Sequence, residues 1–381
     1  MNKLPQWADV VLVPLISLLL AALVAAIVLL AIGQSPTAAL AIMVKGAFGS
    51  ANGWGYTLYY TTSFIFTGLS VIVAFHAGLF NIGGEGQAQL GGLGVALVCL
   101  ALPWPHWTVA LLAATLGAAA FGAAWAAIPA YLQAKRGSHI VITTIMFNYI
   151  ASALIVYMLV DVLRPAGQMD PASARFPAGA KLPALSDMPF ISEFFAKMNA
   201  DGTPKLTKAG VQMYSNVPAN VTLFIALAAC FVVWLLLWRT RLGYQIRAFG
   251  KSEAASKYAG INPVKITMIV MLISGGLAGM MAINNVMGSA ERLLQNSAEG
   301  AGFIGIAVAL MGRNHPLGVL LAALLFGFLY QGGAALGLNT TIPIEMRVVV
   351  QGLVILFTGA LDQMVRMLLV WLFSFGRKAA V

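Results

Sequence analysis

The sequence predicts an all-α fold, a polytopic membrane bundle of about ten transmembrane helices. Hydrophobic residues make up 60% of the 381 positions and charged residues only 9%, and the mean hydropathy is +0.88. Soluble domains carry about 25% charged residues, so this chain lacks the polar side chains that a water-facing surface needs. Uncharged stretches of about 20 residues, the length that crosses a bilayer core, recur along the chain. We therefore expect residues 1–381 to form a single transmembrane domain.

The uncharged stretches give the expected helices in chain order. Val10–Ile32 has 23 residues, more than the roughly 7–15 of a signal-peptide core, so it predicts a first spanning helix. Because one expected span, Gly300–Gly312, is short, counts of nine or eleven helices stay open. The other expected helices are Tyr56–Phe80, two between Gly86 and Ala134 with a turn at Pro103–Trp107, His139–Val160, Asn216–Trp238, Ile266–Gly288, Leu317–Leu338, and Val348–Leu361 extended past the charged Asp362 to Phe375.

The positive charges indicate how these helices are oriented. The net charge is +10, and 13 of the 22 Lys and Arg residues fall at chain ends or short loops that can share one side of the membrane. Short cytoplasmic loops are enriched in Lys and Arg, so we place these residues and both termini in the cytoplasm. The excess positive charge is then explained by the orientation of the helices in the membrane and does not indicate nucleic-acid binding. The 13 residues are Lys3, Lys135, Arg136, Arg239, Arg241, Arg247, Lys251, Lys257, Lys265, Arg313, Arg366, Arg377 and Lys378.

Two segments are expected to lie outside the membrane. Residues 164–215 are rich in Pro, Asp, Lys and Ser, and the helix count makes them a periplasmic insertion. Residues 239–265 form a basic cytoplasmic loop. Within it Ser252–Ala259 favours a short helix, because Ser252 can cap its start and Gly260 can end it in the left-handed conformation.

Motifs for several kinds of enzymatic chemistry do not occur in the sequence. There is no GxxxxGK[ST] loop for ATP hydrolysis, no HExxH zinc motif and no GxSxG nucleophile elbow. Cys99 and Cys230 lie in apolar runs without metal-ligand spacing. We therefore expect no metal site and no cofactor in this chain, and transport rather than an enzymatic activity.

A glycine-rich segment, Phe75–Gly94, contains Glu85, the only acidic residue between Asp9 and Asp161. An ionisable side chain at membrane depth usually faces the bundle interior or a wet cavity. The alternative is a structural cap on exposed backbone amides at the cytoplasmic mouth. A second glycine-rich region comprises Gly275–Gly279, then Asn284 and Asn285, and Gly300–Gly305. The helix count makes the helices after Glu85 and after Gly300 run in opposite directions. This relation suggests an inverted repeat, as in many transporters.

Polar and aromatic residues at membrane depth are candidates for the substrate path. Such side chains can stack on a nucleobase or bind a sugar by hydrogen bonds. Amides also join transmembrane helices to one another, so helix–helix hydrogen bonds are the alternative interpretation of each residue. The candidates are Phe75, His76, Asn81, Glu85, Gln87, Asn148, Tyr149, Asn284 and Asn285.

Three stretches resemble one permease family. They are GLFNIGGEGQAQLGG (78–92), RTRLGYQIRAFGKSEAASKYAGIN (239–262) and GFIGIAVALMGRNHPLG (302–318). Together they are similar to the ATP-binding-cassette (ABC) importer permeases for branched-chain amino acids, simple sugars and nucleosides, most of all the nucleoside branch that depends on BMP lipoproteins. The resemblance implies a bacterial inner-membrane protein with three partners. These are a cytoplasmic ATPase that binds ATP and Mg, a second, related permease subunit, and a periplasmic or lipoprotein substrate-binding protein.

The resemblance also implies that the short cytoplasmic helix docks on the ATPase and transmits its closure. The alternative is a basic loop that only fixes topology, and Gly260 stands seven residues after Glu253 where the EAA signature of many importers has six. The residues of this coupling segment are Ser252, Glu253, Ala254, Ala255, Ser256, Lys257, Tyr258 and Ala259.

Other functions stay open at this point. A simple sugar or a branched-chain amino acid would fit the same family. An ion-coupled secondary transporter would use Glu85 and Asp161 as titrating groups. A membrane enzyme would need polar residues that face one cavity, whereas those present are spread over several spans.

Overall fold

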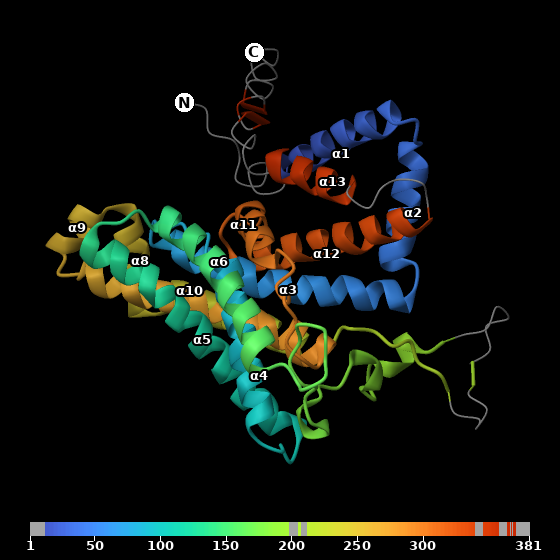
Figure 1. The fold of residues 1–381 in the computed structure, drawn as a ribbon. Helices are drawn as coiled ribbons and strands as arrows, with labels where there is room; N and C mark the ends of the chain where they lie inside the picture. The colour runs from blue at the N-terminus through green and yellow to red at the C-terminus, as the bar shows by residue number, and fades with distance from the viewer. Residues whose placement is uncertain are drawn as a thin grey trace, which may run out of the picture. The chain divides into compact units, whose positions relative to one another are not determined.

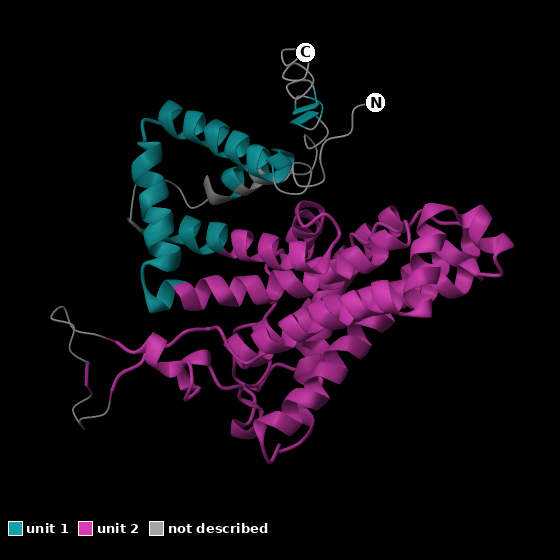
Figure 2. Ribbon diagram, turned by 180° about the vertical axis from the view of Figure 1, so that it is seen from behind, with its two compact units in different colours: residues 1–53, 328–381 teal, residues 54–327 magenta. Residues whose placement is uncertain are grey.

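The fold consists of α-helices joined by loops and by short 3₁₀ and π segments. The computed structural model describes residues 12–197, 205–206, 212–339, 346–357, 364–365, 367 and 369–370. Within these residues extended backbone pairs only in isolated β-bridges, so the predicted all-α class is confirmed. Contacts divide the chain into two compact units, Trp54–Gly327 and the combination of Met1–Gly53 with Phe328–Val381 (Figure 2).

In the described part of the chain, seven helices are long and apolar enough to cross a membrane. Each coincides with an expected span. In chain order they are α1 (Val13–Ala31), α3 (Ala51–His76), α5 (Trp107–Arg136), α6 (Ile140–Tyr157) with its π extension η2 (Met158–Val162), α7 (Thr222–Arg239), α10 (Pro263–Ala282) with its π extension η6 (Ile283–Ala290), and α12 (Pro316–Asn339) (Figure 1).

Three further helices correspond to the remaining expected spans. α4 (Gly84–Ala101) has 18 residues and a polar first turn, α11 (Ala301–Met311) has 11 residues, and α13 (Met346–Ile355) has 10. The expectation of about ten helices is consistent with this set. Several positions that supported the cytoplasmic placement of the termini, Lys3, Arg366, Arg377 and Lys378, lie outside the described residues.

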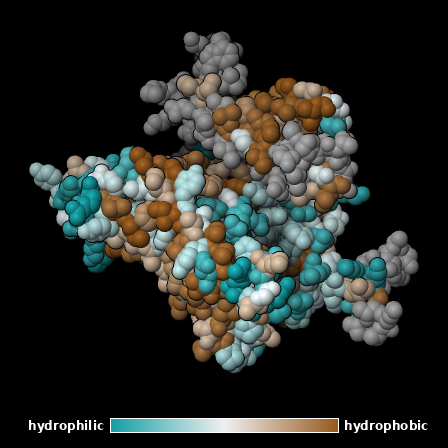
Figure 3. Space-filling view, viewed as in Figure 1, coloured by the Kyte–Doolittle hydropathy of each residue, from teal (hydrophilic) through white to brown (hydrophobic). Residues whose placement is uncertain are grey.

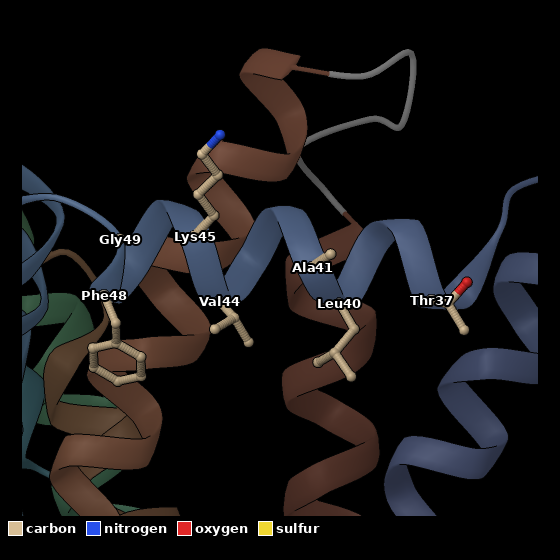
Figure 4. Close-up of a pocket in the computed structure, with 7 residues that line it drawn as sticks. All are labelled: Thr37, Leu40, Ala41, Val44, Lys45, Phe48 and Gly49. Atoms are coloured by element: carbon tan, nitrogen blue, oxygen red, sulfur yellow. The ribbon is translucent and has the colours of Figure 1, made fainter. Parts of the chain in front are cut away.

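One helix, α2 (Pro36–Phe48), was not predicted, because its 13 residues are too few to span and Lys45 interrupts the apolar run. The backbone amide of Ala38 donates to Ser35 Oγ (3.4 Å), which caps the first turn. Its buried face consists of Ala39, Met43 and Ala47. The opposite face carries a shallow groove of about 670 Å³ (Figure 4) lined by Thr37, Leu40, Ala41, Val44, Lys45, Phe48 and Gly49.

Contacts with α3 show where α11 lies along the length of that helix in the larger unit. Gly305 of α11 packs directly against Thr67, and further along the chain the backbone carbonyl of Asn314 lies 2.9 Å from His76 Nε2. α11 therefore begins near the middle of α3 and runs towards its His76 end.

α4 begins beside α11 and runs the opposite way. A Cβ atom at Gly302 would overlap the backbone of Glu85, so the first turns of the two helices touch. Beyond the end of α4, the backbone of Trp104 packs on Gly179 of the insertion. The insertion lies at the Ala51 end of α3, where the rings of Trp54 and Phe194 meet at 6.4 Å. The helices that follow Glu85 and Gly300 thus run in opposite directions, as predicted.

Close helix crossings at glycines join the segment α3–α5 to the segment α10–α12. A Cβ at Gly122 of α5 would overlap the carbonyl oxygen of Gly275 on α10, and a Cβ at Gly279 of α10 would overlap the carbonyl oxygen of Ala118 on α5. A Cβ at Gly327 of α12 would overlap Thr61 of α3. Small residues at such crossings let helix backbones approach closely. Thus α5, which follows α4, packs on α10, and α12, which follows α11, packs on α3. An inverted repeat that matches α3–α5 with α10–α12 predicts these two equivalent contacts.

The insertion is attached to the loop between η6 and α11, residues 291–300. Ala172 forms a β-bridge with Leu294, and Lys181 Nζ lies 2.7 Å from a carboxylate oxygen of Glu291. A further bridge joins Ala184 to Asn220, just before α7. These contacts place the described part of the insertion over the Ala51 end of α3.

Candidate functional site

Glu85 joins the first turns of α4 and α11. Its Oε1 accepts a hydrogen bond from the backbone amide of Gly300 and its Oε2 one from that of Gly302, each at 2.9 Å. The first amides of a helix have no partner within the helix, and a carboxylate there also interacts favourably with the helix dipole. Glu85 is 6% exposed. It therefore caps a helix, as one interpretation proposed, but it does so inside the bundle and for α11 rather than for its own helix.

The turn before α4 is held by a second set of hydrogen bonds. The side-chain amides of Asn81 and Gln87 donate to each other at 2.9 and 3.1 Å. Asn81 Nδ2 also donates to Ser274 Oγ on α10 at 2.8 Å, and Asn81 Oδ1 accepts from the amide of Gly83. Ser274 Oγ in turn donates to the carbonyl of Ser70 on α3 at 2.8 Å. This set ties residues 77–83, the loop between α3 and α4, to α3 and α10.

Asn148 of α6 holds the same turn from the other side. Its Oδ1 accepts from the amide of Gly86 and its Nδ2 donates to the carbonyl of Ile82, both at 2.9 Å. One turn further along, Ser152 Oγ donates to Gln89 Oε1 at 3.0 Å. The start of α4 is therefore fixed by α6 as well as by α10.

Asn284 and Asn285 of η6 organise a third set, towards the Ala51 end of α3. Asn284 Nδ2 donates to the carbonyl of Tyr59 and to Ser63 Oγ, both at 2.9 Å, and its Oδ1 accepts from Thr222 Oγ1 at 2.9 Å. Asn285 Oδ1 accepts from Ser63 Oγ at 2.7 Å, and its Nδ2 donates to the carbonyl of Ser297 at 2.9 Å. These bonds tie the loop 291–300 to α3 and α7.

Six of the nine predicted path residues thus belong to one buried region, which we call the junction: Asn81, Glu85, Gln87, Asn148, Asn284 and Asn285. Each is hydrogen-bonded to another helix or loop, and buried polar networks whose members are satisfied make a structure rigid. The junction fixes two loops that enter the bundle from opposite ends, 77–83 and 291–300, and meet at Glu85. Its geometry suits a fixed pivot in the bundle.

The other three predicted path residues lie outside the junction. Phe75 is 39% exposed and its ring meets that of Phe80 at 6.1 Å. His76 bonds the backbone of Asn314 and stands edge-on to Trp238 with 5.1 Å between ring centres. Tyr149, on α6, is 75% exposed.

Residues 239–265 form two short helices, α8 (Arg241–Lys251) and α9 (Glu253–Tyr258), at the His76 end of α3. The amide of Ala255 donates to Ser252 Oγ at 3.3 Å, and Gly260 has φ +76°, so the cap and the stop are those that the sequence predicts. Tyr258 is 98% exposed, and Lys257 Nζ lies 2.9 Å from Glu253 Oε1. Figure 3 shows hydrophilic residues gathered at this end of the molecule. The helix is held in shape by its own residues, and its side chains are exposed apart from the buried Ser256.

Five residues in the hydrogen-bond sets around the junction were missed by the sequence analysis, namely Ser63, Ser70, Asn220, Thr222 and Ser274. All five are fully or almost fully buried among apolar residues. A hydroxyl in an apolar run usually bonds the backbone of its own helix, as Thr61 does to the carbonyl of Thr57. The sequence therefore offered only a weak signal, and the partners of these residues come from distant helices.

Comparisons with known proteins show the family to which the chain belongs. A family model described as branched-chain amino acid transport system / permease component matches residues 53–359. The chain is 33% identical over 350 residues to the guanosine ABC transporter permease protein NupP of Bacillus subtilis, which covers 92% of this chain and 93% of that protein. It is 34% identical over 349 residues to the nucleoside ABC transporter permease protein NupB of Lactococcus lactis, at 91% and 90% coverage.

A third relative is the glucose ABC transporter permease protein TsgB13 of Haloferax volcanii, 32% identical over 347 residues with 90% and 86% coverage. The extent of the family match confirms the resemblance seen in the three sequence stretches, and the members of this family are transport proteins rather than enzymes. This chain is a multi-pass membrane protein that belongs to the family of branched-chain amino acid transport system permease components.

Proposed function

We propose that this chain is the permease subunit of an ABC importer that moves nucleosides into the cell. The observation that carries the proposal is similarity at 33–34% identity, over more than nine-tenths of the chain, to permeases named for guanosine and nucleoside transport. The capped, exposed α9 supports the importer class, because a separate motor must act on the permease through a defined surface. The chain itself contains no phosphate-binding loop of the GxxxxGK[ST] type.

In this proposal the α8–α9 end faces the cytoplasm and binds the ATPase, which holds ATP and Mg. Arg241, Arg247, Lys251 and Lys257 lie in these two helices, and a concentration of positive charge is typical of the cytoplasmic face. Both termini then lie in the cytoplasm of the bacterial inner membrane. Residues 239–265 are the coupling loop, and residues 164–215 are periplasmic.

The partners at the other end follow from the same orientation. The periplasmic insertion would receive the substrate-binding protein, a lipoprotein in the nucleoside branch. A second, related permease would complete the path. Because one family model spans residues 53–359, we propose that residues 1–381 act as one permease domain.

The mechanism proposed is alternating access about the junction. Loop 77–83 enters from the cytoplasmic end and loop 291–300 from the periplasmic end, and Glu85 joins them. Motion of α9 would reach the first loop through α8, because Gly250 near the end of α8 packs against the backbone of His76 and Gly78. The six junction residues would thus position the walls of the path.

A second candidate substrate is a simple sugar, favoured by the similarity to the glucose permease of Haloferax volcanii. Both substrates carry several hydroxyl groups, so the paths would share their polar contacts. Only a nucleoside also presents an aromatic base.

The test is uptake by the intact complex. The tagged chain is purified from native membranes with whatever stays bound, the bound proteins are identified by mass spectrometry, and the complex is reconstituted in proteoliposomes. Uptake of radiolabelled guanosine that needs ATP, resists a protonophore and is not inhibited by excess glucose supports the proposal. Uptake by the solitary chain under an ion gradient would overturn the importer class, and ATP-driven uptake of glucose alone would overturn the substrate.

A further inference from the structure

An exposed group of aromatic and polar side chains lies along the Ala51-end half of α3 and the loop 291–300. Tyr56 is 37% exposed, and Tyr60 is half-buried. On the loop, Asn296 and Glu299 are exposed. None of these four residues was among the predicted path residues. We call them the α3 wall.

The hydrogen bonds of the junction fix how deep the α3 wall lies. Glu299 directly precedes Gly300, whose amide is bound to the buried Glu85. The Glu299 carboxylate is close enough to the Tyr59 hydroxyl to interact electrostatically with it, and that hydroxyl bonds the side chain of Ser289. Tyr59 is eight residues from the start of the 26-residue α3, which at 1.5 Å per residue is about 12 Å from that end. By the same measure the wall residues Tyr56 and Tyr60 lie about 8 and 14 Å from that end.

The charge at this depth determines what the wall can face. A carboxylate that faces lipid near the middle of a helix costs about 2.5–3.5 kcal/mol on insertion scales, so such groups face a protein interior or water. Glu299 is exposed, and it sits in a loop whose irregular backbone is tolerated at membrane depth only beside protein or a water-filled cavity. The exposed side of the loop therefore faces water or a protein partner rather than lipid.

The aromatic part of the wall has a fixed geometry. The ring of Tyr60 is stacked on that of Phe64, with 6.4 Å between centres and 18° between planes, and stands edge-on to Tyr59 at 5.3 Å. Rings held by such neighbours lose little further entropy when a flat ligand stacks on them. Exposed phenol rings beside an amide and a carboxylate suit a ligand with one aromatic face and several hydroxyl groups.

We propose that the α3 wall is a binding site for nucleoside on the periplasmic side of the path. The base stacks on the tyrosine rings, the ribose hydroxyls donate hydrogen bonds to the Glu299 carboxylate, and the Asn296 side-chain amide bonds the base edge or the sugar. The proposal deepens the proposed function and rests on it, because it assigns a nucleoside contact to residues of this chain.

The experiment measures guanosine uptake by the reconstituted complex. Glu299→Gln keeps the size of the side chain but removes the charge that strengthens its hydrogen bonds, and Tyr60→Ala removes a ring. Each variant is expected to raise KM for guanosine about tenfold. Matched controls outside the wall are Asp161→Asn and Tyr157→Ala, which replace an exposed carboxylate and an exposed ring of α6 and its π extension and are expected to leave KM unchanged.

A substrate analogue separates a direct contact from a structural effect. If Glu299 accepts from ribose, the wild type should prefer guanosine over 2′,3′-dideoxyguanosine, and Glu299→Gln should lose most of that preference. Equal KM values for guanosine in the wild type, Glu299→Gln and Tyr60→Ala would overturn the α3 wall. So would loss of the second permease from purified Glu299→Gln complex, since Glu299 would then be an assembly contact. A wild-type complex that moves no nucleoside would instead overturn the proposed function.

Discussion

The carboxylate of Glu85 accepts a hydrogen bond from the backbone amide of Gly302 at 2.9 Å, although 217 residues separate the two in the chain. This contact joins the first turns of two helices that run in opposite directions. A side chain from one half of the molecule thereby completes the helix cap of the other half. Several properties of the protein should depend on this contact and on the packing around it.

Removing the Glu85 carboxylate should destabilise the protein. Glu85→Ala leaves the buried amides of Gly300 and Gly302 without an acceptor, and we expect a loss of about 2–4 kcal/mol of unfolding free energy. Glu85→Gln keeps one acceptor oxygen and should fall between this variant and the wild type. The midpoint of thermal unfolding in detergent measures both changes. The exposed Asp161→Ala serves as the control, and a Glu85→Ala midpoint equal to that of the wild type would contradict the capping role.

Two neighbouring glycines of α10 should respond very differently to alanine. A Cβ at Gly279 would overlap the carbonyl oxygen of Ala118 on α5, whereas a Cβ at Gly276 would lie 3.4 Å from the nearest atom, the Ala119 carbonyl oxygen, an ordinary contact. Gly279→Ala should therefore separate α5 from α10 and abolish folded protein or uptake, at a cost of about 1–3 kcal/mol or more. Gly276→Ala should be neutral or slightly stabilising, because alanine favours the helix. Size-exclusion profiles and uptake rates of the pair check this, and equal behaviour would show that the close crossing does not matter.

Breaking α9 should uncouple transport from ATP hydrolysis. Ser256→Pro removes the amide that bonds the Ser252 carbonyl at 3.0 Å in the middle of the helix. We expect normal membrane insertion and less than about a tenth of wild-type uptake, as for deletion of Ser252–Ala259. Expression, co-purification of the ATPase and uptake are measured together. Wild-type uptake by the proline variant would refute the coupling role of the segment.

The exposed ring of Phe190 should contribute to docking of the substrate-binding protein. Phe190 is 98% exposed in the insertion, and aromatic side chains at the centre of an interface are frequent hot spots. Phe190→Ser is expected to weaken the binding protein about tenfold or more. Binding to the complex in nanodiscs gives the dissociation constant. Phe231→Ser on α7, where the ring is 61% exposed, is the control for loss of an exposed ring elsewhere. An unchanged constant for Phe190→Ser would place the docking surface outside this part of the insertion.

Local properties of the chain were predictable because they depend on residues near one another in sequence. Uncharged runs marked the long helices such as α1 and α7, and the cap at Ser252 and the stop at Gly260 marked α9. The search for long uncharged runs missed α2, because this helix has only 13 residues and contains a lysine. The glycine-rich segment around Glu85 was correctly singled out, but its partner was not.

The residues that act together were decided by packing. The sequence made path candidates of Phe75 and Tyr149 as well as of Asn81, Asn148 and Asn284. Only the three asparagines belong to the junction. Likewise Tyr60 and Glu299 look unremarkable in the sequence, and only the entry of loop 291–300 into the bundle brings them to one exposed surface.

The sequence by itself determined the solvent in which this protein folds, its long helices, its family and the short exposed helix α9. Hydropathy, charge and capping act over one or two turns, and these features need no more than that. Tertiary structure alone decided that Glu85 caps α11, that α5 packs on α10 while α12 packs on α3, and which polar residues are buried and which are exposed. Those outcomes depend on close approach of backbones and on hydrogen bonds between groups more than 200 residues apart, and a pattern read along one chain does not contain those distances.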